Sequence, residues 1–251
     1  MTTGRPSTGR GGWEVRCEGV TCRYDGTTAL DGVDVTFRPG VITGLVGRNG
    51  AGKSTLARCI AAWERPRDGR VLVDGAPVWE DAGRTSRVVL AGTSGPEVGD
   101  QPVRVTLDLM ESLRPDFDRD LFQDLTARIG AEPGPRPNRL STGQAAAFRG
   151  ALALAAQAEV TILDEVHLGM DAVSRRRFGR VLLEEYVRRP RTIIVSSHLL
   201  DEVEDVLEDV VVLHRGRVLA TGSADELRER HSRGRLASLT DVLEALTEEA
   251  R

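Results

Sequence analysis

The chain has 251 residues, 40% of them hydrophobic and 29% charged, and a formal net charge of −4. This composition is typical of a folded soluble domain; it excludes a wholly disordered chain, a fibrous repeat and a protein that coats nucleic acid by bulk charge. Of the 34 basic residues, all but Lys53 are arginine. GC-rich coding favours arginine codons and explains the arginines, but it leaves the single lysine unexplained.

The N-terminal segment 1–12 carries two arginines and no apolar stretch after them, so we interpret it as a flexible leader and not as a signal peptide. The longest apolar patch without a basic residue, Ala151–Ala156, is far shorter than the roughly 20 residues of a membrane helix. If the protein works at a membrane, we therefore expect a peripheral subunit. Cys17, Cys22 and Cys59 form no CxxC pair or histidine cluster, which is typical of reduced intracellular thiols.

Strand-like and helical segments alternate over most of the chain. The expected strands are, in chain order, Val33–Phe37, Val41–Val46, Gly69–Gly75, Arg87–Ala91, Val160–Leu163, Thr192–Val195 and Val210–Leu213. The main expected helices between them are Ser54–Trp63, Asp171–Arg189 and Leu199–Leu207, the last with Ser197 as its cap. Because the last three strand runs are short and β-branched, we expect them to be covered on both faces. The alternation predicts an α/β fold with a largely parallel sheet.

Two regions depart from this alternation. From about residue 94 to 140 no strong strand run occurs: Val103–Leu113 and Leu121–Ile129 look helical, and Gly130–Asn138 holds three prolines and two glycines. We interpret this stretch as a small helical insertion rather than a linker. From Asp225 onward the pattern predicts two helices split around Ser232–Arg235.

The segment Gly47–Ser54 fits the pattern GxxxxGK[ST] and lies between an apolar run and a predicted helix. In a phosphate loop, glycines let backbone N–H groups point at phosphate oxygens, and the following helix presents its positive end. Lys53 would reach the β- and γ-phosphates as a compact cation, and the Ser54 hydroxyl would ligate Mg²⁺. The glycine spacing does not make the GxGxxG of a dinucleotide site. The segment therefore predicts a nucleoside triphosphate site.

A pair of acidic residues, Asp164 and Glu165, directly follows the apolar run Val160–Leu163. Successive strand side chains point to opposite faces, so the two carboxylates are expected to have different tasks. One can serve Mg²⁺, directly or through water, while the other polarises an attacking water. Taken alone, the pair could also be an ordinary solvated turn at a strand end.

Further motifs resemble the ATP-binding-cassette (ABC) family of ATPases. Leu140–Gln144 (LSTGQ) is similar to the family's LSGGQ signature, and Tyr24, upstream of the phosphate loop, matches the aromatic residue that stacks on adenine. Ser196–His198 resembles the histidine switch, and Gly169–Asp171 resembles the D-loop. These elements occur in the family's order, which makes coincidence negligible.

The resemblance implies a P-loop NTPase fold of the ABC type, with a mostly parallel core sheet, an N-terminal antiparallel β region and a small helical subdomain. It also implies a head-to-tail pair of cassettes that enclose two ATP molecules, each with Mg²⁺. The residues that would bind ATP are Tyr24, Gly47, Arg48, Asn49, Gly50, Ala51, Gly52, Lys53, Ser54 and Thr55.

The resemblance also implies roles for the remaining motif residues. Glu165 is the general base, His198 contacts the γ-phosphate, and Asp164 holds the metal ion together with Ser54. Asp171 belongs to the D-loop. The signature residues act on the ATP of the partner subunit, and they are Ser141, Thr142, Gly143 and Gln144.

Several of these residues have simpler interpretations when each is taken alone. Ser141 and Asp171 could be N-caps of the helices that follow them. His198 could be a histidine at a strand end without a catalytic role, and Tyr24 a half-buried strand aromatic. Their spacing to the phosphate loop and to the acidic pair favours the roles that the family implies.

The chain departs from the family pattern in four places. Thr93 stands where the Q-loop glutamine is expected: its hydroxyl substitutes in the metal and water contacts, or Gln101 folds back, or the contact is missing, and we favour the first. Val166 stands where proline is usual, His167 where serine or threonine is frequent, and Thr142 replaces a signature glycine. None of these changes removes a catalytic group, so we expect a competent ATPase.

The resemblance implies an ATPase subunit that drives a separate integral membrane permease and pairs with a second ABC ATPase subunit, identical or different, without a nucleic-acid partner. Ser238–Thr247, Arg114–Asp118 and Ser197–Glu204 are similar to segments in ATPases of bacterial drug, lipid and cell-envelope-stress exporters. We therefore expect an exporter subunit at the cytoplasmic face of the cell membrane. The alternatives are a soluble ABC ATPase of the iron–sulfur assembly type and a nucleotide-binding regulatory module with little hydrolysis.

The expected organisation has three parts. The leader (1–12) precedes an ABC ATPase domain (13–222), into which the helical signature subdomain is inserted at about 94–156. A C-terminal helical tail (223–251) follows.

Overall fold

The computed structural model describes residues 11–92, 100–131, 136–197, 204–232 and 235–250. Its strands are β1 (Val15–Tyr24), β2 (Thr27–Phe37), β3 (Ile42–Val46), β4 (Asp68–Val73), β5 (Ala76–Pro77), β6 (Val88–Ala91), β7 (Val160–Asp164), β8 (Thr192–Ser197), β9 (Asp209–His214) and β10 (Arg217–Ser223). Its α-helices are α1 (Lys53–Ile60), α2 (Ala82–Thr85), α3 (Val103–Leu113), α4 (Arg119–Ile129), α5 (Thr142–Ala155), α6 (Ala172–Arg188), α7 (Ala224–Arg230) and α8 (Leu239–Glu249). Two 3₁₀ turns are η1 (Pro137–Arg139) and η3 (Glu204–Val206).

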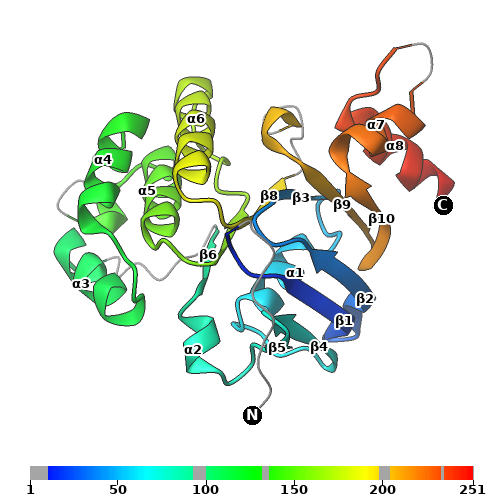
Figure 1. The fold of residues 1–251 in the computed structure, drawn as a ribbon, viewed down its shortest axis with the longest axis horizontal. Helices are drawn as coiled ribbons and strands as arrows, with labels where there is room; N and C mark the ends of the chain where they lie inside the picture. The colour runs from blue at the N-terminus through cyan, green and yellow to red at the C-terminus, as the bar shows by residue number, and fades with distance from the viewer. Residues whose placement is uncertain (1–10, 93–99, 132–135, 198–203, 233–234, 251) are drawn as a thin grey trace.

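The strands form two sheets of different topology. The larger sheet has the order β10-β9-β3-β8-β7-β6, and its strands are parallel except β10, which runs antiparallel to β9. The smaller sheet, β2-β1-β4-β5, is wholly antiparallel. In Figure 1 the smaller sheet lies beside the larger one, close to α1. The expected mostly parallel core sheet and N-terminal antiparallel region are confirmed.

Alternation along the parallel strands divides their side chains between two cores. In β8, Ile193 and Val195 belong to the core that the helices α3–α8 share, whereas Ile194 belongs to the core of α1 and the smaller sheet. In β3, Val46 and Leu45 are divided in the same way. Because both faces are covered, every residue of β7 and β8 is buried, as the β-branched runs predicted.

The helices α3, α4, α5 and α6 lie together on one side of the larger sheet (Figure 1). The helix α4 begins two residues earlier than predicted, because the Asp118 side chain accepts a hydrogen bond from the Leu121 N–H (2.8 Å) and caps the helix there. Phe122 of α4 meets Phe148 of α5 edge to face, with ring centroids 5.4 Å apart. The predicted boundaries of the domains remain a prediction.

The helix predicted over Leu199–Leu207 lies mostly outside the described residues, and its described part contains the 3₁₀ turn η3. Ser197, expected to cap that helix, is the last residue of β8. The two C-terminal helices are confirmed as α7 and α8. Both pack beside β10, at the upper right of Figure 1. Nowhere in the described part of the chain does a helix combine the length and the apolar character needed to span a membrane.

Candidate functional site

The phosphate loop joins β3 to the N-terminus of α1, where the sequence placed it. Two of its glycines are required by the surrounding backbone. A Cβ on Gly47 would lie 2.2 Å from the Leu213 carbonyl oxygen of β9. Gly52, the N-cap of α1, has a φ of 107°, which is open to glycine but strained for other residues. The two glycines therefore let the chain turn from β3 into α1, so the loop lies at the positive end of a helix, where anions bind.

Lys53, the single lysine, lies inside this loop with only 5% of its surface exposed. Its ammonium donates hydrogen bonds to the carbonyl oxygens of Gly47 (2.8 Å) and Arg48 (3.4 Å), and it lies 3.4 Å from Glu165 Oε1. Three donors on a flexible stem can exchange these oxygens for phosphate oxygens without moving the backbone. The ion pair with Glu165 brings the two sequence-predicted elements into contact.

Asp164 is the last residue of β7, and its side chain is buried beside the glycine that follows β6. Its Oδ1 atom accepts no hydrogen bond from the described residues. A buried carboxylate oxygen without a partner is costly unless an ion or a water binds it. Asp164 and the Ser54 hydroxyl are hard oxygen donors, which Mg²⁺ prefers. The residues present therefore fit a magnesium ion.

Glu165 follows β7 in a left-handed backbone conformation, with φ at 53°. This conformation costs a non-glycine residue roughly 1–2 kcal/mol, so the surrounding contacts must hold it. The Glu165 N–H donates to the Ser196 carbonyl at the end of β8 (3.0 Å), and the Leu168 N–H donates to the Glu165 carbonyl (3.0 Å). Glu165 thus lies just beyond β7, which ends at Asp164, and the prediction that the two carboxylates have different tasks stays a prediction.

A cavity of about 420 Å³ lies over these groups. It is lined by residues of β1, β2, the phosphate loop, α1 and the turn after β7, and they are Tyr24, Ala29, Asn49, Gly50, Gly52, Lys53, Ser54, Thr55 and Glu165. Tyr24 lies at the rim, 41% exposed. The tertiary structure thus gathers one aromatic ring, one ammonium, two hydroxyls and one carboxylate in a single hollow.

Three residues of this region were missed by the sequence analysis. Ala29 of β2 lines the cavity. Glu64 accepts hydrogen bonds from the Tyr24 hydroxyl and from Arg58 Nε (3.2 Å), and Arg58 also reaches the Thr55 hydroxyl (3.4 Å). Arg58 and Glu64 therefore link the aromatic rim to the first turn of α1. They carry no motif, and no signal in the sequence could have identified them.

The signature residues do not line this cavity. Ser141 is the N-cap of α5: its hydroxyl accepts from the Gln144 N–H (3.2 Å), and the Gln144 side chain accepts from the Ser141 N–H (3.0 Å). This capping box satisfies two helix-end donors and leaves the turn exposed. Gly143 approaches the D-loop so closely that a Cβ on it would lie 2.5 Å from the Gly169 carbonyl oxygen. The turn therefore faces outward, available to another molecule.

Asp171 caps α6 by accepting hydrogen bonds from the N–H groups of Val173 (2.8 Å) and Ser174 (2.9 Å). The pKa of Asp171 is held below its ordinary value, mainly by the hydrogen bond from the Ser174 N–H and next by the one from the Ser174 hydroxyl. His198 and Thr93 lie outside the described residues. Gln101, the alternative to Thr93, is exposed and does not line the cavity.

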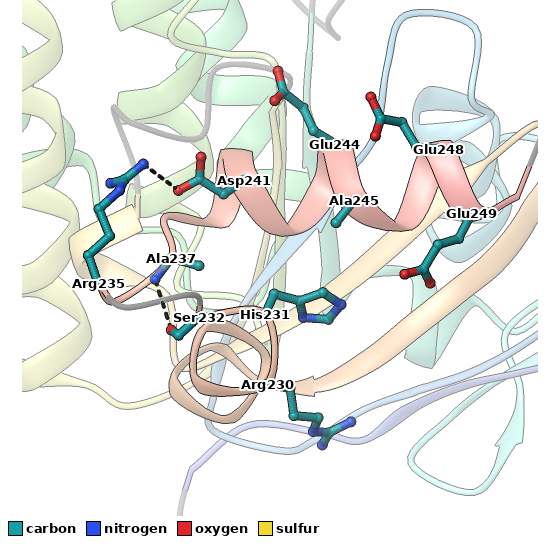
Figure 2. Close-up of a pocket in the computed structure, with 10 residues that line it drawn as sticks. All are labelled: Arg230, His231, Ser232, Arg235, Ala237, Asp241, Glu244, Ala245, Glu248 and Glu249. Atoms are coloured by element: carbon teal, nitrogen blue, oxygen red, sulfur yellow. Dashed lines mark hydrogen bonds and ion pairs between the residues drawn. The ribbon is translucent and has the colours of Figure 1, made fainter.

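A second hollow, of about 700 Å³, lies between α7 and α8 (Figure 2). Its walls carry both signs of charge, with Arg230, Arg235, Glu244 and Glu248 among the lining residues. Arg235 pairs with Asp241 (3.2 Å) across its edge. No residue of the phosphate loop or of the acidic pair lines it, so it is separate from the candidate site.

The geometry around Lys53 is suited to a polyphosphate attached to an aromatic base. The helix end and the ammonium provide positive charge, the oxygens of Asp164 and Ser54 are of the kind that can ligate a metal ion, and the Glu165 carboxylate is of the kind that can accept a proton. A positioned carboxylate within reach of a water is the minimal requirement for general-base hydrolysis.

Comparison with known proteins agrees with this geometry. Residues 30–167 match the family model described as "ABC transporter". The chain is 28% identical to the ABC transporter ATP-binding protein YtrB of Bacillus subtilis, over 90% of this chain and 77% of that protein. It is 33% identical to the nickel import ATP-binding protein NikO of Rhodobacter capsulatus, over 88% of this chain and 94% of that protein.

Longer relatives and solved structures extend the comparison. The chain is 29% identical to the ATP-dependent lipid A-core flippase of Xylella fastidiosa over 92% of its own length, and it spans 41% of that protein. It superposes with a TM-score of 0.78 and 23% identity on the structure titled "Structure of ATP binding subunit of ABC transporter", covering 93% of this chain and 99% of the other. The structural likeness confirms the P-loop NTPase fold of the ABC type.

Proposed function

Because the chain belongs to the family of ABC transporter ATP-binding domains, which bind ATP and hydrolyse it to power transport, we propose that it is the ATPase subunit of an exporter whose membrane-spanning part is a separate chain. The observation that carries the proposed site is the single cavity that joins Lys53, Ser54 and Glu165 to the aromatic ring of Tyr24.

In this proposal each group of the cavity has one task. Tyr24 stacks on adenine, and the loop N–H groups with the Lys53 ammonium bind the phosphates. Asp164 and Ser54 hold Mg²⁺, which when bound neutralises charge on the β- and γ-phosphate oxygens. Glu165 accepts a proton from the water that attacks the γ-phosphate. The Lys53–Glu165 pair is exchanged for a Lys53–phosphate contact, which frees the carboxylate for this role.

The exposed signature turn supports a second part of the proposal, a head-to-tail dimer. Ser141, Thr142, Gly143 and Gln144 act on the ATP of a partner cassette, identical or different, and Asp171 lies at the contact between the two. A helix N-terminus opened by serine and glycine is an anion-binding end, which suits a γ-phosphate presented by another chain. Within each chain, His198 contacts the γ-phosphate of the ATP that the Lys53 of the same chain binds. Thr93 serves the metal ion and water in place of the Q-loop glutamine.

The direction of transport is proposed from resemblance to relatives. The flippase is an exporter-type relative, and the closing segment of the chain resembles those of exporter ATPases; NikO is an importer subunit. We place the chain at the cytoplasmic face of the membrane, bound to a permease. Transport by the purified complex in vesicles tests this: an importer would accumulate substrate on the side of the cassettes. Co-purification with a soluble scaffold in place of a membrane protein would support the iron–sulfur assembly alternative.

Replacement of Glu165 by Gln tests the catalytic assignment. Because an amide cannot accept the water's proton, we expect ATP hydrolysis to fall at least a hundredfold, while Mg-ATP binding is kept and an ATP-bound dimer accumulates. Steady-state hydrolysis and size-exclusion chromatography measure the two effects. Glu159→Gln is the matched control, because Glu159 directly precedes β7 and does not line the cavity. Equal hydrolysis by wild type and Glu165→Gln would refute the general-base role. Very little hydrolysis by the wild type itself would favour the regulatory module.

A further inference from the structure

A buried side-chain hydrogen bond lies directly behind the acidic pair. His167 Nε2 is 3.1 Å from Ser197 Oγ. His167 is 6% exposed and Ser197 is fully buried. This bond joins the turn that follows β7 to the last residue of β8. Neither residue has a role in the catalytic scheme above.

The bond belongs to a short network that determines where Glu165 lies. Glu165 is tied to Ser196 by its backbone N–H, and the Met170 N–H donates to the His167 carbonyl (3.2 Å), so the turn is closed on both sides of His167. Because Glu165 has a left-handed backbone, the turn would relax toward commoner conformations if these contacts were lost. The imidazole of His167 links this turn to the end of β8.

The chemistry of His167 and Ser197 suits a direct contact. The imidazole shares a small cavity with the apolar side chains of Val166, Phe178 and Leu182 and with Arg175. A neutral imidazole has one donor and one acceptor nitrogen, and a serine hydroxyl can complement either of them. The contact with Ser197 therefore persists for both tautomers.

We propose that His167 is a positioning residue for ATP hydrolysis, which holds Glu165 at the γ-phosphate by bonding Ser197. This inference rests on the proposed role of Glu165 as general base. A general base must lie within about 2.6–3.2 Å of the proton it accepts, and a misplacement of about 1 Å can cost a hundredfold in rate. The bond connects the end of β8 to the turn that carries Glu165, so it fixes the position of this turn relative to the strand.

The test uses the full chain and begins with three variants that remove the bond: His167→Leu, Ser197→Ala and the double variant. We expect each single variant to lower kcat by about ten- to a hundredfold, while the dissociation constant for Mg-ATP changes less than twofold. Because both changes remove the same bond, the double variant should hydrolyse ATP no more slowly than the slower single variant. His167→Gln, whose amide can reach the place of Nε2, should recover most of kcat even if His167→Leu fails to fold.

His231→Leu is the matched control, since it removes a histidine bond of similar length elsewhere. His231 Nδ1 lies 2.8 Å from the Leu227 carbonyl, and its ring lies between α7 and α8 (Figure 2). We expect its kcat to equal that of wild type. The proposal is overturned if His167→Leu and Ser197→Ala act additively on kcat, if kcat is unchanged, or if loss of kcat is matched by loss of ATP binding and thermal stability. Glu165→Gln, assayed in parallel, separates these results from failure of the general-base assignment.

Discussion

At the scale of single residues, Lys53 determines the electrostatics of the site. It is buried at the start of α1, it is bonded to two loop carbonyls, and it is paired with Glu165. A buried ammonium is stable only when such partners surround it, and phosphate oxygens are equivalent partners. Arginine, which the chain uses at every other basic position, has a planar fork that is larger than an ammonium and needs a different cavity.

We predict that Lys53→Arg weakens Mg-ATP binding at least tenfold although the charge is kept. The reason is steric, because the Gly47 carbonyl lies only 2.8 Å from the present ammonium. Isothermal titration with Mg-ATP measures the affinity. Arg70→Lys is the control: it exchanges arginine for lysine at an exposed position of β4 and should leave the affinity for Mg-ATP unchanged. Tight binding by Lys53→Arg would contradict the requirement for a compact charge.

At the scale of elements, the two C-terminal helices differ in how their first turns are capped. The Ser238 hydroxyl accepts from the Asp241 N–H (3.1 Å), and the Asp241 side chain accepts from the Ser238 N–H (2.9 Å). Ser223 occupies the same N-cap position of α7 but makes no side-chain cap hydrogen bond. The apolar face of α8, with Leu239 and Val242, then joins the core under the larger sheet.

This pair of serines allows a matched prediction. Ser238→Ala should lower the free energy of unfolding by about 1 kcal/mol, because a helix-end donor loses its acceptor. Ser223→Ala should lower it much less. Urea unfolding followed by circular dichroism compares the two variants. Equal losses would show that the capping box contributes nothing beyond the propensity change from serine to alanine.

At the scale of the whole molecule, the core between α1 and the smaller sheet buries all three thiols. Cys17, Cys22 and Cys59 are free, and the sulfur atoms of the last two are 3.4 Å apart. Burial, and second the charge of Asp34, raises the pKa of Cys17 to about 12. Burial also raises the pKa of Cys22 and Cys59. The core therefore keeps these thiols protonated and poorly reactive.

The raised thiol pKa values predict an alkaline loss of stability. The unfolded chain releases the Cys17 proton near its ordinary pKa of 9.0, and the folded chain retains it to about 12, so the folded state binds more protons in between. The contribution of Cys17 to the free energy of unfolding is thus fully present below pH 9 and is lost as the pH rises toward 12. The raised pKa values of Cys22, Cys59 and Tyr24 act on stability in the same direction.

Melting temperatures between pH 8 and 11 measure this effect, and Cys17→Ala should flatten the decline. Val15→Ala, on the same face of β1, is the control: it removes buried apolar surface without a titrating group, so its curve should be shifted but parallel to wild type. A decline in Cys17→Ala as steep as in wild type would assign the alkaline loss to other groups.

The sequence alone determined the elements whose signals are local. The phosphate loop, the β-branched strands and the helices α3 and α6 follow from spacing and periodicity within a few residues, and they are where the patterns placed them. The gathering of Tyr24, Lys53 and Glu165 could be anticipated only through resemblance to a family. Their separations in the chain are too long for a local rule to decide which side chains meet.

Only the tertiary structure decided the contacts that position these groups. Arg58 and Glu64 reach the rim, Ala29 enters the cavity from β2, and His167 bonds Ser197 between two strands. Such contacts depend on how elements far apart in the chain pack, to within a few tenths of an ångström, and no pattern of residue types encodes that precision. The lone lysine marked the site in the sequence; the packing around it determines which groups it faces.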